Sequence, residues 1–265
     1  MDKLQEDRDW STAVNALDHL GLDLRAYKRP QLERRLNSFM QREGYRNIEA
    51  LIGALQRDPA LYRKLHSYLT IHVTDLFRDT RYWEYWRNSI QEQRQSHWSV
   101  WSAGCSWGAE PVTAALILQE LGRNYHIIAT DSDDTVLDQA RHGLFTDDNY
   151  AKIPDAYRHY FHRQGQEWSA LPFNGGTVSY RRHDVTLEPP PGKFDAIICR
   201  NLIIYFESPV RHRVLSGFVS ALRPDGILFL GATETFLEFS ELGFAAIAPS
   251  IFKKISRTNA TNYGD

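Results

Sequence analysis

Cysteine, long apolar runs and net charge are all scarce in this sequence. Only two of its 265 residues are cysteine, and neither Cys105 nor Cys199 has the spacing of a metal or redox motif. We interpret both as small apolar residues near strand ends in a reducing cytoplasm. No apolar run approaches the roughly 20 residues of a membrane helix, and the start MDKLQEDRDW is too polar for a signal peptide. The formal net charge of −2 gives no global attraction to nucleic acid or to an anionic membrane. We therefore expect a cytoplasmic globular protein without a nucleic-acid partner.

Helix signals dominate the first third of the chain, and we expect residues 1–86 to form an all-α domain. Pro30 stands where a first helical residue would be, and Gly44 ends the apolar periodicity that follows it. Asn47 and Asp58 are placed to cap two further helices.

From about residue 97 short apolar runs alternate with helical stretches. Strands are expected in WSVWSA, HIIATD, FDAIICRN and GILFLGAT, with helical patterns between them. This alternation is typical of a parallel sheet wrapped by helices. Asn174-Gly175-Gly176 has the composition of a hairpin turn, which predicts a small β excursion at about 165–183. The α/β domain would span residues 87–256, and the polar segment 257–265 would be a disordered tail.

A strand–turn–helix unit in VWSAGCSWGAEPVTAALIL suggests a cofactor site. Gly104 and Gly108 match neither the dinucleotide fingerprint nor the phosphate loop. Asp131 ends the next strand, where a carboxylate can accept hydrogen bonds from both hydroxyls of a ribose. Glu110, at the start of the helix, would repel a phosphate but could bind an amine; it could also simply stabilise the helix. A cofactor with a ribose and an amine but no phosphate fits this pattern, and S-adenosylmethionine has these properties.

Basic side chains are concentrated in residues 25–46, against two acidic ones, Glu33 and Glu43. A solvated helix surface would explain them, and so would docking onto an acidic partner helix. The seven basic residues are Arg25, Lys28, Arg29, Arg34, Arg35, Arg42 and Arg46.

Five motifs, in order and spacing, resemble the CheR family of chemotaxis receptor methyltransferases. They are IHVTDLFRDTRYW, VWSAGCSWGAEP, IIATDSDDTVLDQARHGLF, FDAIICRNLIIYF and LRPDGILFLGATE, with GLDLRAYKRPQLERRL before them. The resemblance runs from about residue 20 to 255. It implies an α/β fold: a class I (Rossmann-like) methyltransferase domain with a small antiparallel β-subdomain, preceded by an all-α N-terminal domain.

The resemblance also implies a reaction and its partners. The family transfers the methyl group of S-adenosylmethionine to glutamate side chains of methyl-accepting chemotaxis receptors, as protein-glutamate O-methyltransferases, and releases S-adenosylhomocysteine. A monomer is expected, reaching a membrane only through the receptor.

Site residues carry over position by position. The implied catalytic pair is Arg78 and Tyr205. The implied cofactor contacts are His72, Thr74, Arg78, Ala103, Glu110, Asp131, Asp184, Val185, Arg200 and Asn201. The implied docking residues are Lys28, Arg29, Arg34 and Arg35, and no metal is expected. The chain departs from the family pattern at four positions: His72 and Asp184 stand where Asn is usual, and Trp107 and Ala109 replace Thr and Glu.

Two other functions remain compatible with the sequence. One is a catalytically weakened scaffold or sensor that binds S-adenosylmethionine or S-adenosylhomocysteine. The other is a methyltransferase for a small carboxylic acid. A dehydrogenase is disfavoured by Glu110 and by the missing third glycine.

Overall fold

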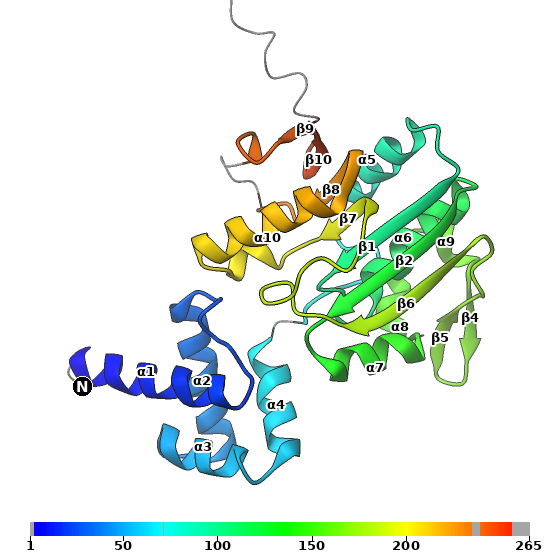
Figure 1. Ribbon diagram of the computed structural model, residues 1–265. Helices are drawn as coiled ribbons and strands as arrows, with labels where there is room; N and C mark the ends of the chain where they lie inside the picture. Colours follow the sequence, from blue (N-terminus) through cyan, green and yellow to red (C-terminus); the bar gives the residue numbers. More distant parts are fainter. Residues whose placement is uncertain (1–2, 71, 235–238, 256–265) are drawn as a thin grey trace, which may run out of the picture. The chain divides into compact units, whose positions relative to one another are not determined.

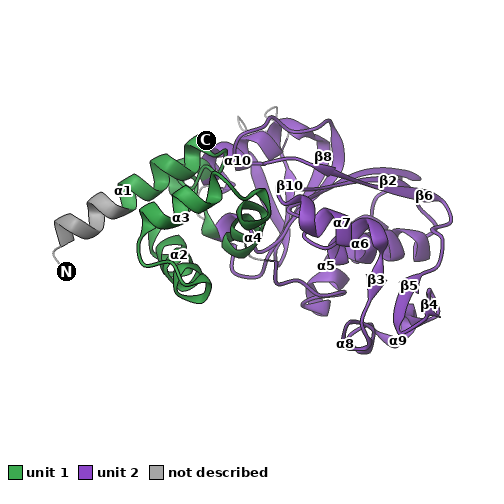
Figure 2. Cartoon of the chain, turned by 90° about the horizontal axis from the view of Figure 1, so that it is seen from below, with its two compact units in different colours: residues 1–71, 205–210 green, residues 72–204, 211–265 purple. Residues whose placement is uncertain are grey.

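The computed structural model describes residues 3–70, 72–234 and 239–255 and divides into two compact units (Figures 1 and 2). One unit holds residues 1–71 with 205–210, and the other holds residues 72–204 with 211–265. The division falls earlier than the expected boundary at residue 86, because the next helix packs within the second unit. The expected tail at 257–265 lies outside the described residues. No helix among those described is both long and apolar enough to cross a membrane.

The helical unit follows the start and stop signals in the sequence. Its helices are α1 (Lys3–His19), α2 (Arg29–Glu43), α3 (Ile48–Leu55) and α4 (Pro59–Leu69). Gly44 ends α2 with a left-handed φ of 78°, which favours glycine. The Asn47 side chain accepts from the Ala50 amide, and Asp58 caps α4 in the same way. The segment 205–210 joins this unit through pairing of Tyr27 with Phe206.

A seven-stranded sheet forms the centre of the second unit (Figure 1). Its order is β6 (Gly176–Arg182), β2 (Asn124–Asp131), β1 (His97–Ala103), β7 (Phe194–Cys199), β8 (Leu222–Leu230), β10 (Ile251–Lys254) and β9 (Phe244–Ala248). The first five strands are parallel, and β10 runs antiparallel to both neighbours. The strand order reverses between β1 and β7, and ligands of open α/β sheets bind beyond the carboxyl ends of the strands at such a point.

Helices cover both faces of this sheet. Residues of α5 (Thr80–Gln91) and α6 (Ala109–Glu120) share one core cluster with Trp98 and Val100 of β1. Trp101 points to the opposite face, where it packs edge-on against Phe218 of α10 (Ser208–Ala221). The remaining short elements are α7 (Asp134–His142), α8 (Asp147–Ala151), α9 (Asp155–Arg158) and the 3-10 turn Ile203–Tyr205.

A separate small antiparallel sheet is present, but not where the hairpin turn was expected. Its order is β3 (Leu144–Phe145), β5 (Glu167–Ala170) and β4 (Phe161–Gln164), and Gly165 makes the turn between β4 and β5. The prediction of a hairpin turn at Asn174-Gly175-Gly176 was wrong, because β6 pairs in parallel with β2 of the large sheet. A Cβ at Gly176 would lie 2.3 Å from the Tyr125 ring, so this glycine permits close packing rather than a turn.

Candidate functional site

Asp131, the last residue of β2, lies at the carboxyl edge of the sheet and is 8% exposed. One carboxylate oxygen accepts from the Ser106 amide at 2.9 Å and the other from the Asp133 amide at 3.1 Å. Each oxygen keeps further lone pairs, because a carboxylate offers about four acceptor sites. Burial raises the pKa of Asp131, and the two amides favour its ionised form. The predicted ribose acceptor is therefore fixed and only partly satisfied by the protein.

The turn after β1 offers few free amides to a phosphate. The amides of Gly104 and Cys105 both donate to the Thr130 carbonyl, at 2.8 Å each. The Gly108 amide donates to the Cys105 carbonyl, and that of Ser106 is taken by Asp131. Phosphate loops work by pointing unpaired amides at the anion. This turn is thus built differently from a dinucleotide site, as its glycine spacing predicted.

Glu110 is a buried carboxylate in the first turn of α6. Its Oε1 accepts from the Ser102 hydroxyl at 3.0 Å, and the residue is 7% exposed. Burial raises its pKa to about 7, and the positive charge of Arg200 opposes that shift. A cationic ligand would do the same more strongly, because an opposite charge favours the ionised form.

Arg200 follows β7 and is almost completely buried. Its guanidinium Nη2 lies 3.0 Å from Asp79, and its Cζ lies 4.9 Å from the ring centroid of Phe229 and 5.4 Å from that of Trp83. Desolvation lowers its pKa. Among the described residues its Nε has no hydrogen-bond partner. Arg200 is thus held by stacking and one ion pair, with a donor to spare.

Asn201 adopts a left-handed conformation with φ 58°, and its buried Oδ1 has no partner within the described part of the chain. Across the turn, a Cβ at Gly104 would lie 2.6 Å from Leu202. Buried polar atoms are normally paired, so an orphan acceptor beside an orphan donor on Arg200 suits a polar ligand.

Arg78 lies in a segment anchored to α6, because the Phe77 amide donates to the Thr113 hydroxyl at 3.1 Å. The Arg78 Nη1 donates to the Val73 carbonyl at 2.6 Å, and its side chain is about one-third exposed. Asp79 beside it takes a φ of 56°. Arg78 can therefore reach solvent-side ligands while its backbone is fixed.

The residues that depart from the family pattern have defined partners. His72 Nε2 lies 3.0 Å from Asp133 Oδ2, and Asp133 donates its amide to Asp131. Trp107 packs against Phe145 in the core cluster, and Ala109 is fully buried.

Four further predicted contacts lie around the same edge or on the segment leading to it. Ala103 is the last residue of β1 and is buried. The His183 amide donates to the Asp131 carbonyl, which brings the following Asp184 and Val185 beside the end of β2. Asp184 Oδ1 accepts from the amide and the hydroxyl of Thr186. Thr74 is half-buried between His72 and Arg78 in the chain.

Tyr205 and the predicted docking residues belong to the helical unit. The Lys28 amide donates to the Tyr205 carbonyl at 2.9 Å. Arg29 pairs with Glu33 along α2. The Arg35 guanidinium donates to the carbonyls of Tyr68 and Thr70 at the end of α4. The fourth, Arg34, is exposed.

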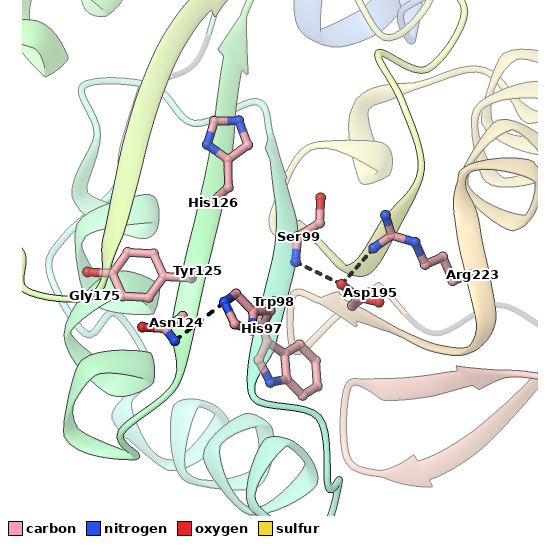
Figure 3. A pocket seen from close by; sticks show the side chains of 9 residues that line it. All are labelled: His97, Trp98, Ser99, Asn124, Tyr125, His126, Gly175, Asp195 and Arg223. Atoms are coloured by element: carbon pink, nitrogen blue, oxygen red, sulfur yellow. Dashed lines mark hydrogen bonds and ion pairs between the residues drawn. The ribbon is translucent and has the colours of Figure 1, made fainter.

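A hollow of about 580 Å³ opens at the opposite, amino edge of the sheet (Figure 3). No residue predicted for the site lines it. Its lining is His97, Trp98, Ser99, Asn124, Tyr125, His126, Gly175, Asp195 and Arg223. The dashed lines in Figure 3 show that Asp195 already accepts from Ser99 and Arg223.

Sequence reasoning missed three carboxylates that shape the carboxyl edge: Asp79, Asp133 and Glu234. The carboxylate of each contacts a predicted residue, namely Arg200, His72 and Asn201 respectively. All three lie within motifs that carry the family resemblance, IHVTDLFRDTRYW, IIATDSDDTVLDQARHGLF and LRPDGILFLGATE, and that was the signal available for them.

Comparison with known proteins gives consistent matches. Residues 72–246 match the family model of the SAM-binding domain of CheR methyltransferases, and residues 16–70 match that of the all-alpha domain. The chemotaxis protein methyltransferase of Listeria monocytogenes is 32% identical, covering 92% of this chain and 95% of the relative. That of Klebsiella aerogenes is 31% identical, over 83% and 80%. That of Borreliella burgdorferi is 28% identical, over 89% and 90%.

Proposed function

The chain belongs to the CheR methyltransferase family, and from that premise we propose that it methylates glutamate side chains of chemoreceptors. The methyl donor is S-adenosylmethionine, and the products are glutamate γ-methyl esters and S-adenosylhomocysteine. The observation that carries this is the pair of buried carboxylates, Asp131 and Glu110, beside a turn in which the amides of residues 104, 105, 106 and 108 already have partners. Such a site favours a ribose and a cation and disfavours a phosphate.

We assign the cofactor's parts to residues by their chemistry. Asp131 would accept from the ribose hydroxyls, and Glu110 would bind the amino group. Asp184 and Val185 would face the adenine, with Ala103, His72 and Thr74 as further contacts. Arg200 Nε and Asn201 Oδ1 would supply a donor and an acceptor that have no partner among the described residues.

The reaction needs positioning more than proton transfer. A glutamate is already ionised near neutral pH, so no general base is required. S-adenosylmethionine supplies an electrophilic methyl group on a positive sulfur, and both reacting charges are lost as the methyl moves. A water-poor site therefore favours the transfer, and in-line alignment supplies the rest.

We propose that Arg78 orients the substrate carboxylate and that Tyr205 bonds to it or shapes the path of the methyl group. An arginine is suited to hold a carboxylate with directed hydrogen bonds, and one oxygen must stay free to attack. At saturating cofactor, Arg78→Ala should lower kcat, with Arg78→Lys recovering part of it. Full turnover in Arg78→Ala would contradict this role.

The proposed docking surface consists of Lys28, Arg29, Arg34 and Arg35, and these residues are not equally suited to a test by charge reversal. Charge reversal at Arg35 would remove the donors to the Tyr68 and Thr70 carbonyls and so disturb the helical unit itself. Arg34 is exposed and is the better probe. Arg34→Glu should weaken binding of a receptor fragment while leaving the affinity for S-adenosylhomocysteine unchanged. A methyltransferase for a small carboxylic acid would show no loss in turnover with that acid.

The proposed reaction is tested directly with methyl-labelled S-adenosylmethionine and a chemoreceptor cytoplasmic fragment. Label on the receptor that alkali releases as volatile methanol would identify a carboxyl methyl ester. Cofactor binding without any transfer would instead favour the scaffold or sensor.

A further inference from the structure

Another buried carboxylate, Glu234, follows β8 and contacts the turn that carries Arg200 and Asn201. It is 0% exposed. Its Oε2 accepts from the amides of Gly231 at 2.6 Å and Asn201 at 2.7 Å, and its Oε1 accepts from the Ile204 amide at 3.3 Å. One side chain therefore joins the end of β8 to the turn that follows β7.

Burying a carboxylate away from water costs free energy unless its hydrogen bonds offset that cost. Within residues 3–70, 72–234 and 239–255, the structure shows no ion pair for Glu234; its direct partners are backbone amides, and the nearby Arg200 charge interacts with it without direct contact. Burial raises its pKa, and the hydrogen bonds from those amides oppose the shift. An apolar residue would avoid the desolvation cost but would leave the buried amides unpaired.

Gly231 shows independently that the contact is tight. Its φ is not in the left-handed region, so conformation does not require glycine there. A Cβ at this position would lie 2.7 Å from Glu234 Oε2 and 2.9 Å from both the backbone amide nitrogen and the side-chain Nδ2 of Asn201. Glycine is thus required by the close approach of three groups, and an alanine would push the carboxylate away from the turn.

The turn held in this way carries Arg200 and Asn201. Asn201 has a left-handed φ of 58°, and its own backbone amide donates to Glu234 Oε2. Left-handed non-glycine backbone is strained and persists only where surrounding contacts fix it. Glu234 supplies such a contact directly at Asn201, whose Oδ1 has no partner in the described part of the chain.

We infer that Glu234, with Gly231, is a positioning residue that holds the Arg200–Asn201 turn in its ligand-binding geometry; the inference rests on the proposed function of that turn in cofactor binding. It does not touch the cofactor in this role. It acts through the backbone of Asn201 and Ile204.

Two measurements on Glu234→Gln test the inference. In glutamine one acceptor oxygen becomes an NH₂ group, which faces an amide it cannot accept from. Amide hydrogen exchange of the free protein should become faster at Asn201 and Ile204. Calorimetric affinity for S-adenosylhomocysteine should fall about tenfold or more, the size expected for lost hydrogen bonds to a charged group. Gly231→Ala should do the same without changing charge.

Asp195→Asn is the matched control, because Asp195 also accepts a backbone amide, that of Ser99, but at the other edge of the sheet. It should leave the S-adenosylhomocysteine affinity within about twofold, and unfolding midpoints measured on all variants separate loss of stability from loss of binding. Unchanged amide exchange in Glu234→Gln would show that Glu234 does not hold the Arg200–Asn201 turn in place. Faster exchange with unchanged affinity for S-adenosylhomocysteine would show that holding this turn does not position it for the ligand. Failure of the wild type to bind S-adenosylhomocysteine would refute the proposed function and with it this role. The exchange data would still report whether Glu234 holds the Arg200–Asn201 turn in place.

Discussion

The two edges of the seven-stranded sheet differ in what their polar groups lack. At the amino edge the hollow is large, but its charges are neutralised: Asp195 meets Arg223 at 2.7 Å and is also bonded to Ser99. At the carboxyl edge Asp131 and Glu110 are buried and are bonded to amides or a hydroxyl rather than directly to a cation. Buried charge without a full set of partners, rather than the size of a hollow, distinguishes the edge that we propose as the functional one.

Backbone conformation separates the edges in the same way. Four of the six described non-glycine residues with positive φ lie in the segments of the carboxyl edge: Phe77, Asp79, Ser106 and Asn201. Such conformations cluster where a site over-determines the backbone. Because each of these residues neighbours or carries a predicted contact, strain and predicted chemistry coincide.

Removing the Asp131 carboxylate is expected to have the largest effect and tests whether the carboxyl edge holds the cofactor. Asp131→Ala should lower the affinity for S-adenosylmethionine and S-adenosylhomocysteine by about 100-fold or more, because it deletes the ribose acceptor and frees two buried amides. Titration calorimetry measures this, with Asp131→Asn as the closest variant in shape. Retained micromolar binding in the alanine variant would show that the carboxyl edge does not hold the ribose.

Much of the edge was predictable because it depends on local pattern. The strands that end in Ala103, Asp131 and Cys199 follow from alternating apolar and helical segments, and their carboxyl ends meet wherever the strands are parallel. The two cysteines are buried, as their surroundings indicated. Helix caps at Asn47 and Asp58 were equally local.

What the sequence did not reveal depends on contacts between distant segments. Nothing around Gly176 shows that the Tyr125 ring packs on it, so its glycine pair was misread as a hairpin turn. Nor does the sequence pattern of α5 show that Trp83 and Trp86 pack against Phe229. This packing places α5 in the second unit, so the boundary between the units falls before α5 rather than at residue 86. The role of Glu234 rests on amides 30 and 33 residues away.

The pH dependence of cofactor binding tests the proposed role of Glu110 at the carboxyl edge, because the pKa of this residue is raised to about 7. A cationic cofactor needs the ionised form, so affinity should rise with pH up to about 7 and then level off, with proton release on binding below that point. The slope approaches about tenfold per pH unit on the acid side. Calorimetry in buffers of different ionisation enthalpy measures the released proton, and Glu110→Gln should abolish both the slope and the release.

In the ligand-free protein, the Glu110 carboxyl makes the stability fall as pH rises, whereas the affinity for the cofactor rises. Its folded pKa lies above the ordinary value of 4.5, so its contribution to stability is fully present below pH 4.5 and is lost as pH rises through about 7. Denaturant unfolding of Glu110→Gln should lack this loss. A stability profile identical to that of the wild type across this window would contradict the raised pKa.

A smaller effect is expected where the edge departs from the family pattern. His72→Asn removes the 3.0 Å contact with Asp133, but Asp133 still accepts from the Thr135 amide and donates to Asp131. One such bond is worth about 0.5–1 kcal/mol, so affinity for S-adenosylhomocysteine should change by about two- to fivefold. A loss as large as that of Asp131→Ala would mean that His72 itself holds the cofactor.

The smallest effect belongs to the amino edge. Arg223→Ala removes the ion pair with Asp195, but the Arg223 side chain is 47% exposed, and such pairs are worth about 0–1 kcal/mol. Asp195 keeps its bond from the Ser99 amide, so the strand ends should stay in place. Affinity for S-adenosylhomocysteine should stay within about twofold, and the unfolding free energy should fall by no more than about 1 kcal/mol. A large loss of affinity would mean that the two edges are coupled through the sheet, and incomplete pairing of buried charge would then no longer be enough to locate the site.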